Sequence, residues 1–218
     1  MKINVIEKNF PVSKAVRELF NKAGIGIYSD EKKCPADSDW IISDYDFTEE
    51  YAEFLCAKAI GLPGVIVNTE RLQIREIGMN DLAAYKALLN ECSDFLDEDF
   101  SEMSETDFKK RHEEYIKYHY NFFGFGLWGL WFINEPDKLI GLAGVSGNDH
   151  TLSYCITREY RNKGFAYEAC SHIIRYMAEE HSVNDITAVI SENNEPSIHL
   201  AKKLGIEIRI IKKASADT

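Results

Sequence analysis

A short basic segment, RNKG at residues 161–164, stands directly before an amphipathic run. The run repeats apolar residues at helical spacing from Phe165 to Met177, which predicts a helix packed on a sheet. The start of such a helix carries backbone N–H groups without intrahelical partners and the positive end of the helix dipole. A glycine lets an anion approach the backbone closely, and the two cations add positive charge. The segment therefore predicts an anion site, for phosphate or pyrophosphate.

Taken alone, the same residues also fit an ordinary surface helix start with a turn glycine. Two further observations bear on the choice. Residues 161–166 have the form [Q/R]-x-x-G-x-[G/A] and follow the β-like run SYCIT. A second β-like run, DITAVIS at 185–191, is followed by the pattern N-x-x-x-S-x-x-x-x-x-K-x-G, which is filled by Asn193, Ser197, Lys203 and Gly205. In this order and spacing the two segments resemble the signatures of the GNAT superfamily of N-acyltransferases.

Two upstream segments extend the resemblance. TERLQIREIGMNDL, from residue 69, resembles the first strand and helix of that superfamily. The segment 123–145 resembles its second and third strands, above all in the branch that includes the ribosomal-protein-alanine acetyltransferases. The likeness covers residues 69–211. It implies an α/β fold with a mixed sheet, the acyl-CoA N-acyltransferase fold.

The resemblance also implies a cofactor, acetyl-CoA, and residues that hold it. The strand before the basic loop would offer backbone groups to the pantetheine arm, at Cys155, Ile156 and Thr157. The pyrophosphate would lie on the N–H groups of Arg161, Asn162, Lys163, Gly164, Phe165 and Ala166. Asn193 and Ser197 would contact the pantetheine or the thioester region. The reaction implied is direct attack of a primary amine on the acetyl thioester, after the amine has lost a proton.

The sequence departs from the superfamily pattern where proton transfer is concerned. Many members carry a carboxylate early in the strand before the loop, and here that place holds Thr151 beside His150. Many carry a tyrosine four residues after the position of Ser197, and here that residue is Ala201. Tyr154, His150 and Ser197 are therefore the candidate catalytic residues, although a single His or Tyr on a strand also fits a structural role. A non-catalytic acyl-CoA-binding sensor or interaction module remains an alternative to the enzyme.

An acidic run at residues 91–107 holds eight carboxylates and no Lys or Arg. In the resembled fold this region builds the acceptor wall, where carboxylates would attract a cationic amine. A polyamine, an aminoglycoside-like compound or a peptide N-terminus fits that charge, and so does a solvated loop without function. The aromatic residues at 115–123 have helical spacing, which favours a place in the core.

The remaining elements divide the chain into two expected domains. Residues 1–68 predict a small α/β domain of unknown role, with strands at 3–7, 24–28, 40–45 and 64–68 and helices at 12–23 and 49–61. Residues 69–218 form the GNAT-like acetyltransferase domain. Within it we expect a long helix at 105–123, a hairpin that turns at Glu135-Pro136-Asp137, and a final strand at 206–211. The superfamily usually ends with one strand more.

Composition excludes several other classes. A formal net charge of -11 argues against nucleic-acid binding, which relies on Lys and Arg. The chain has no apolar run of the roughly 20 residues that a membrane helix needs. Five scattered cysteines without a CxxC pair suit reduced thiols in a cytoplasmic protein. The histidines show no metal-ligand spacing, so we expect no metal. A homodimer is compatible with the sequence.

Overall fold

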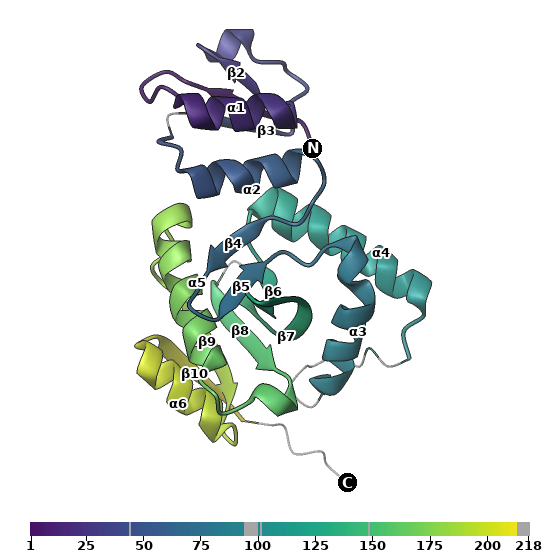
Figure 1. Ribbon diagram of the computed structural model, residues 1–218. Coiled ribbons are helices and arrows are strands. Elements are labelled where there is room, and N and C mark those ends of the chain that lie inside the picture. Colours follow the sequence, from purple (N-terminus) through teal and green to yellow (C-terminus); the bar gives the residue numbers. More distant parts are fainter. Residues whose placement is uncertain (44, 94–99, 101, 148, 213–218) are drawn as a thin grey trace. The chain divides into compact units, whose positions relative to one another are not determined.

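The computed structural model describes residues 1–43, 45–93, 100, 102–147 and 149–212. The chain folds as two compact units, Met1–Val65 and Ile66–Thr218 (Figure 1). Each unit has its own sheet, with three strands in the first and seven in the second.

The first unit is a small parallel sheet with two helices. Its strands are ordered β2 (Gly26–Tyr28), β1 (Ile3–Ile6), β3 (Trp40–Ser43). Helix α1 (Lys14–Ala23) begins where the Ser13 hydroxyl accepts the N–H of Val16. Helix α2 (Glu49–Ala59) begins where Thr48 does the same for Tyr51, and a short 3-10 helix η1 (Glu31–Lys33) precedes β3. The expected strands and helices of residues 1–61 are therefore present, with shorter bounds.

The second unit is built on the sheet β10-β9-β8-β7-β6-β5-β4. The strands are β4 (Val65–Asn68), β5 (Leu72–Arg75), β6 (Leu127–Phe132), β7 (Glu135–Ser146), β8 (Thr151–Ile156), β9 (Thr187–Ser191) and β10 (Glu207–Ile211). Strands β5 to β8 pair antiparallel, and β8 to β10 pair parallel. The parallel part requires crossovers, and these are helices α5 (Phe165–His181) and α6 (Glu195–Leu204). The expected mixed α/β sheet is confirmed.

Helices cover both faces of this sheet. Alternate residues of a strand point to opposite faces, so the neighbours Cys155 and Ile156 of β8 join different clusters. Ile156 packs with the apolar stripe of α5, made by Phe165, Ala169, Cys170, Ile173 and Met177. Cys155 packs toward helices α3 (Leu82–Glu91) and α4 (Glu105–Tyr115), which contribute Leu88, Leu89 and Phe108. Two 3-10 helices, η2 (Met79–Asp81) and η5 (Arg158–Tyr160), complete the connections.

Three expectations about this unit need correction. We expected residues 64–68 to be a strand of the N-terminal unit, but β4 is the edge strand of the larger sheet. The reason is a tight turn: the N–H of Thr69 donates to the carbonyl of Leu72 at 2.7 Å and returns the chain into β5. The hairpin turn lies at residues 133–134, not at Glu135-Pro136-Asp137. Pro136 instead falls where the register of β7 shifts against β6, a place that tolerates a residue without an N–H.

The third correction concerns the helix expected to run to residue 123. It is α-helical only to Tyr115 and continues as a π-helix, η4 (Ile116–Phe123). The hydroxyl groups of Tyr115 and Tyr120 both bond the backbone of Leu127, the first accepting its N–H and the second donating to its carbonyl. Residues five apart nearly share a face in a π-helix, whose hydrogen bonds join i and i+5, so this winding lets both tyrosines reach one residue.

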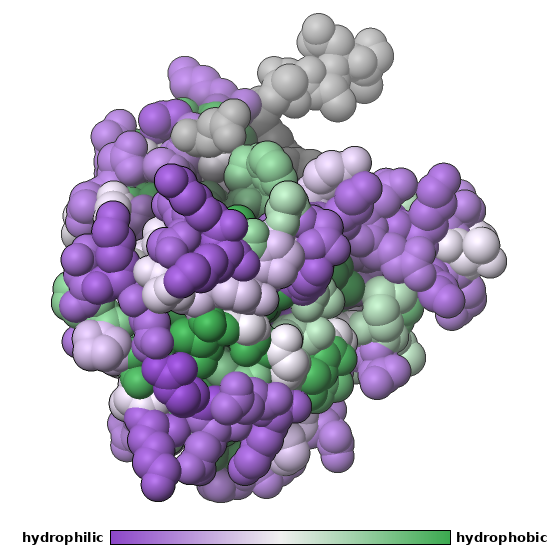
Figure 2. Space-filling model, turned by 90° about the horizontal axis from the view of Figure 1, so that it is seen from above, coloured by the Kyte–Doolittle hydropathy of each residue, from purple (hydrophilic) through white to green (hydrophobic). Residues whose placement is uncertain are grey.

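One face of the molecule is predominantly polar (Figure 2). The face shown in Figure 2 is mostly hydrophilic, and its apolar side chains gather in separate patches between polar ones. Strand β10 pairs directly with β9 and lies at the edge of the sheet. Within residues 1–43, 45–93, 100, 102–147 and 149–212, no strand follows it.

Candidate functional site

The basic loop is a tight turn whose backbone groups converge. Two of its residues have the left-handed conformation, Asn162 with φ 61° and Gly164 with φ 84°. Helix α5 begins at Phe165, with Gly164 as its N-cap. Left-handed residues alternating with others turn successive N–H groups toward a common concavity, which suits an anion. The turn lies at the positive end of a 17-residue helix and has a backbone geometry that suits an anion, and the anion site itself stays a prediction.

The two cations of the loop do not behave alike. The Nε group of Arg161 donates to the carbonyl of Ile156 at 2.9 Å, so this side chain is held at the end of β8. The ammonium of Lys163 lies 5.2 Å from the centre of the Tyr160 ring and is exposed. Lys163 is thus the side chain of the pair that keeps mobile positive charge at the loop.

Strands β8 and β9 separate soon after they meet. Their one register pair among the described residues is Thr151 with Thr187, next to the N–H of Thr187 donating to the carbonyl of His150. Beyond this pair the two strands diverge toward the basic loop. Backbone groups of β8 that face β9 are therefore left for another partner, and an amide-bearing chain can bond them.

The alternation of β8 decides which backbone groups face the gap. The N–H of Thr157 donates to the carbonyl of Ile140 at 2.9 Å, so Thr157 turns its backbone to β7. The hydrogen-bonded register with β7 places Cys155 in the same orientation. Tyr154 and Ile156 then turn their backbones toward β9. Of the expected backbone partners Cys155, Ile156 and Thr157, only Ile156 turns its backbone toward the gap, as Tyr154 also does.

The Cys155 side chain lies on the opposite face from the helix α5. It is buried and hydrogen-bonded to the thiol of Cys92, at the end of α3. This bond and burial raise the pKa of Cys155 well above its usual value, while the same bond lowers the pKa of Cys92. Cys155 is therefore a neutral thiol that fixes α3 against β8.

Two of the three candidate catalytic side chains meet. The hydroxyl of Tyr154 lies 2.9 Å from the hydroxyl of Ser197, which belongs to the first turn of α6. Burial raises the pKa of Tyr154, although the hydrogen bond to Ser197 partly opposes it, so the phenol is protonated at neutral pH. Ser197 is held in place because its N–H donates to the side chain of Asn194, the cap of α6. Asn193, which we expected at the cofactor, is exposed and is not this cap.

The third candidate, His150, lies apart from this pair. Its Nδ1 atom is 2.7 Å from a carboxylate oxygen of Asp185, and this contact holds the pKa of Asp185 below its usual value. His150 has φ 48° and precedes β8, at the end where β8 and β9 still pair. The structure thus brings Tyr154 and Ser197 together and leaves His150 as a separate His–Asp pair.

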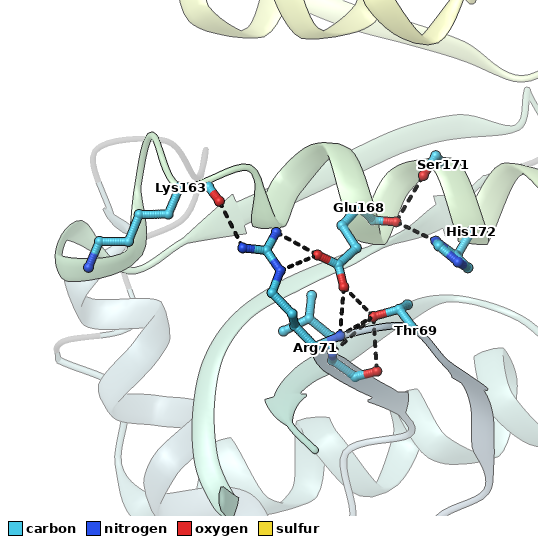
Figure 3. A network of polar contacts seen from close by, with 7 residues as sticks. Thr69, Arg71, Lys163, Glu168, Ser171 and His172 are labelled. Atoms are coloured by element: carbon cyan, nitrogen blue, oxygen red, sulfur yellow. Dashed lines mark hydrogen bonds and ion pairs between the residues drawn. The ribbon is translucent and has the colours of Figure 1, made fainter. Parts of the chain in front are cut away.

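A network that sequence reasoning missed supports the loop from below (Figure 3). Glu168, in the first turn of α5, accepts a hydrogen bond from the hydroxyl of Thr69 at 2.5 Å and from the backbone N–H of Arg71 at 2.9 Å. The guanidinium of Arg71 bonds the same carboxylate through Nε at 2.6 Å and Nη2 at 2.5 Å. Thr69 and Arg71 precede Glu168 by 99 and 97 residues, so no local spacing could have shown the contact.

The acceptor side is only partly described. Residues 94–99 and 101 of the acidic run lie outside the described residues. Of the rest, Glu91 accepts the N–H of Arg158 at 2.5 Å and so ties α3 to the start of η5. The aromatic residues of η4 divide: Tyr120 is buried, whereas Tyr118, Phe122 and Phe123 are exposed, contrary to the expectation that all belong to the core.

Comparison with known proteins agrees with this geometry. Residues 71–207 match the family model "Acetyltransferase (GNAT) domain". A GnaT-family acetyltransferase from Bordetella pertussis is 18% identical over 63% of this chain and 86% of its own, with a TM-score of 0.54. RimL, a ribosomal L7/L12 alpha-N-protein acetyltransferase solved with coenzyme A, is 12% identical over 64% and 82%, with a TM-score of 0.54. A chimera of spermidine N-acetyltransferase from Vibrio cholerae and hSSAT is 20% identical over 61% and 78%, with a TM-score of 0.50.

The chain therefore belongs to the GNAT acetyltransferase family, and the resemblance found in its sequence is confirmed. It is an acyl-CoA-dependent acetyltransferase that transfers an acetyl group from acetyl-CoA to an amine. Family membership supports the enzyme over the non-catalytic sensor. The loop and the strand gap fit such a cofactor, since they offer converging N–H groups and an open strand edge.

Two other kinds of feature, a metal cluster and a membrane-spanning helix, are absent from the part of the chain that the structure describes. No group of three or more His, Cys, Asp or Glu side chains there could hold a metal ion. None of the helices there combines the length and the apolar character required to cross a membrane.

The contacts of Glu168 predict a pH-dependent stability. Burial alone would raise the pKa of Glu168, but hydrogen bonds from Thr69 and Arg71 outweigh it and bring the pKa below its ordinary value of 4.5. Such a carboxylate stabilises the fold above that ordinary value and loses the effect as the pH falls through its folded pKa. Glu168→Gln should therefore lower the free energy of unfolding at neutral pH. The difference in unfolding free energy between variant and wild type should disappear in acid. Urea unfolding over a pH series measures it.

Glu179→Gln is the matched control, because Glu179 is an exposed carboxylate on the same helix. It should show no gap at any pH. A gap for Glu168→Gln that stays constant into acid would contradict the assignment, since it would then come from packing and not from charge.

Proposed function

We propose that this chain acetylates a cationic primary amine by direct attack of the amine on acetyl-CoA. The observation that carries the proposal is the gap between β8 and β9, which opens into the basic turn at the start of α5. An open strand edge that leads to an anion-binding turn matches a ligand with two parts. Its amide-bearing arm would bond the strand edge, and its pyrophosphate would bind at the turn.

We assign the cofactor to residues of the β8 edge and of the turn before α5. The N–H groups of residues 162–166 hold the pyrophosphate, and Lys163 adds a mobile charge. The backbones of Tyr154 and Ile156 bond the pantetheine arm. When bound, acetyl-CoA supplies an acetyl group activated as a thioester.

The hydroxyl groups of Tyr154 and Ser197 form a proton donor at the inner part of the gap. Ser197 is fixed by the cap of α6, and the raised pKa of Tyr154 keeps its proton available. We assign to this pair the donation of a proton to the departing sulfur. A thiolate is a modest base, so the assistance needed is small.

His150 is the candidate for the opposite transfer, from the amine. Its Nδ1 contact with Asp185 leaves Nε2 as the atom that accepts a proton, directly or through water. An alkylammonium with a pKa of about 10.4 must lose its proton before it can attack. The ammonium loses two protons on becoming an amide. His150 takes the first before attack, and the second, which leaves the nitrogen after attack, replaces the proton that the Tyr154–Ser197 pair gives to the sulfur.

The acceptor is proposed to carry positive charge beyond the reacting amine. Exposed carboxylates at Glu102, Glu105 and Asp107 belong to the acidic run beside α4. The names of two similar structures support a cationic acceptor. RimL is named for the α-amine of a ribosomal protein, and the chimera is named for spermidine. Fixed negative charge raises the local concentration of such a substrate.

Gly164→Glu tests the cofactor site. It places a carboxylate at the anion turn, and two like charges about 4 Å apart repel by about 1–4 kcal/mol near a surface. We expect coenzyme A to raise the melting temperature of the wild type, and the variant to bind it at least tenfold more weakly by calorimetry.

Two control variants separate charge from backbone strain. Gly164→Ala has the same strained φ without the charge, and Gly205→Glu introduces the same charge at a left-handed residue with φ 72° away from the loop. Both should keep most of the affinity. Equal affinity for coenzyme A in Gly164→Glu and wild type would refute the loop assignment.

Tyr154→Phe and Ser197→Ala test the proton donor. Each should lower kcat by about a hundredfold, the lower end of the range for general acids, because the leaving thiolate needs limited help. The KM for acetyl-CoA should change little. The double variant should be no slower than the slower single variant, because the two hydroxyl groups act as one unit. Tyr167→Phe, on exposed α5 surface, is the control; unchanged kcat in both test variants would exclude the pair.

An amine panel tests the charge of the acceptor. Polyamines and basic peptides should have a higher kcat/KM than monoamines without a second cation, and the advantage should shrink as salt screens the carboxylates. Thiol release from acetyl-CoA measures it. Monoamines that outcompete polyamines and basic peptides at low salt would rule out the cationic acceptor.

A further inference from the structure

Arg71 occupies an electrostatically unfavourable place. Its guanidinium lies at the start of α5, with Cζ 4.2 Å from the centre of the Phe165 ring, and Nη2 would be 3.5 Å from a Cβ atom on Gly164. The start of a helix is its positive end, which repels a cation. The placement is therefore maintained by specific partners, and Figure 3 shows them: Glu168 on one side and the carbonyl of Lys163 on the other.

The contact with Lys163 determines the direction of the next N–H group. The Nη1 group of Arg71 donates to the Lys163 carbonyl at 3.1 Å. In a trans peptide the C=O and the N–H of one unit point in opposite directions, and the described chain has no cis peptide. The N–H of Gly164, in the same peptide unit, must then point away from Arg71, toward the outer side of the turn where an anion is expected.

The contact with Glu168 removes an opposing charge. A carboxylate in the first turn of α5 interacts well with the helix dipole but repels an anion bound at that same helix start. Arg71 neutralises it through two hydrogen bonds, and Thr69 takes a third. The fork of a guanidinium can serve the carboxylate and the carbonyl together, which a lysine ammonium cannot do in a fixed geometry.

We propose that Arg71 is a positioning residue for the cofactor pyrophosphate: it aims the Gly164 N–H at the anion and cancels the charge of Glu168. The inference rests on the proposed cofactor site and assigns it a support that lies in the turn between β4 and β5. Arg71 acts through the backbone of the loop and does not itself contact the phosphates.

Arg71→Lys and Arg71→Ala provide the test, with coenzyme A and pantetheine as probes. Pantetheine lacks the pyrophosphate, so its affinity reports only on the strand gap. Both variants should bind coenzyme A about tenfold more weakly, the order expected from losing one charge-assisted hydrogen bond, and should bind pantetheine as the wild type does. Arg209→Lys is the matched control, because Arg209 also faces carboxylates on this sheet but lies on β10.

The lysine variant separates positioning from simple charge. If Arg71→Lys keeps the affinity of the wild type while Arg71→Ala loses it, charge alone is sufficient and the proposal is overturned. Equal losses for coenzyme A and pantetheine also overturn it, because they show a general loss of structure. A wild-type protein that binds neither probe would instead refute the proposed function, so the two failures are distinguishable. In turnover, the supporting result is a raised KM for acetyl-CoA with kcat nearly unchanged.

Discussion

The divergence of β8 from β9 is the constraint on which the rest of the site depends. Parallel strands that stay paired satisfy each other's backbone, and these two stop after Thr151 and Thr187. The open edge is tolerable because parts of it have side-chain partners. Arg161 bonds the carbonyl of Ile156 at one end, and the hydroxyl groups of Tyr154 and Ser197 join β8 to α6 further along β8. The gap is thus supported at both ends and open between them.

Positive charge is concentrated where the gap ends, although the chain is acidic with 36 carboxylates against 25 cations. The helix start, the left-handed residues and Lys163 all favour an anion at one point. Each of these contributions is small near water, and salt weakens them. Their common direction, set by the backbone of the turn, is what we expect to make the proposed site selective. An acidic surface elsewhere then discourages polyanions from binding at random and leaves this turn as their place.

Sequence patterns predicted the parts of the site that are local. The stripe from Phe165 to Met177 predicted α5, and its basic start predicted the turn, because helix periodicity and left-handed glycines are properties of neighbouring residues. The hydrogen bond between the hydroxyl groups of Tyr154 and Ser197 was not predictable from the sequence. Both residues were nevertheless predicted as candidate catalytic residues, because each lies at a fixed spacing within or near a recognised motif. The orientation of Thr157 was missed because it depends on its register with β7.

Other misses have the same origin in contacts that are distant along the chain. The turn was predicted at Pro136 because a proline is common in turns. The register of β6 against β7 shifts there instead, and the pairing register of two strands cannot be derived from their composition. The π-helix follows from two tyrosines that share Leu127, a residue beyond the helix itself. The position of the aromatic residues on η4 changed with that winding, which exposed Phe122 and buried Tyr120.

The Arg71–Glu168 contact connects a locally determined turn with residues that are distant along the chain. The left-handed residues Asn162 and Gly164 give the turn its local shape, and a distant side chain bonds the carbonyl of its Lys163–Gly164 peptide unit. That partner is the residue directly before β5, a strand that β6 and β7 separate from β8 in the sheet order. The cost of holding a cation against the helix dipole is offset by the carboxylate of Glu168, and the carboxylate in turn is harmless to an anion only because the cation is there. Neither residue is explained without the other, and together they make the support of the turn a property of the whole sheet.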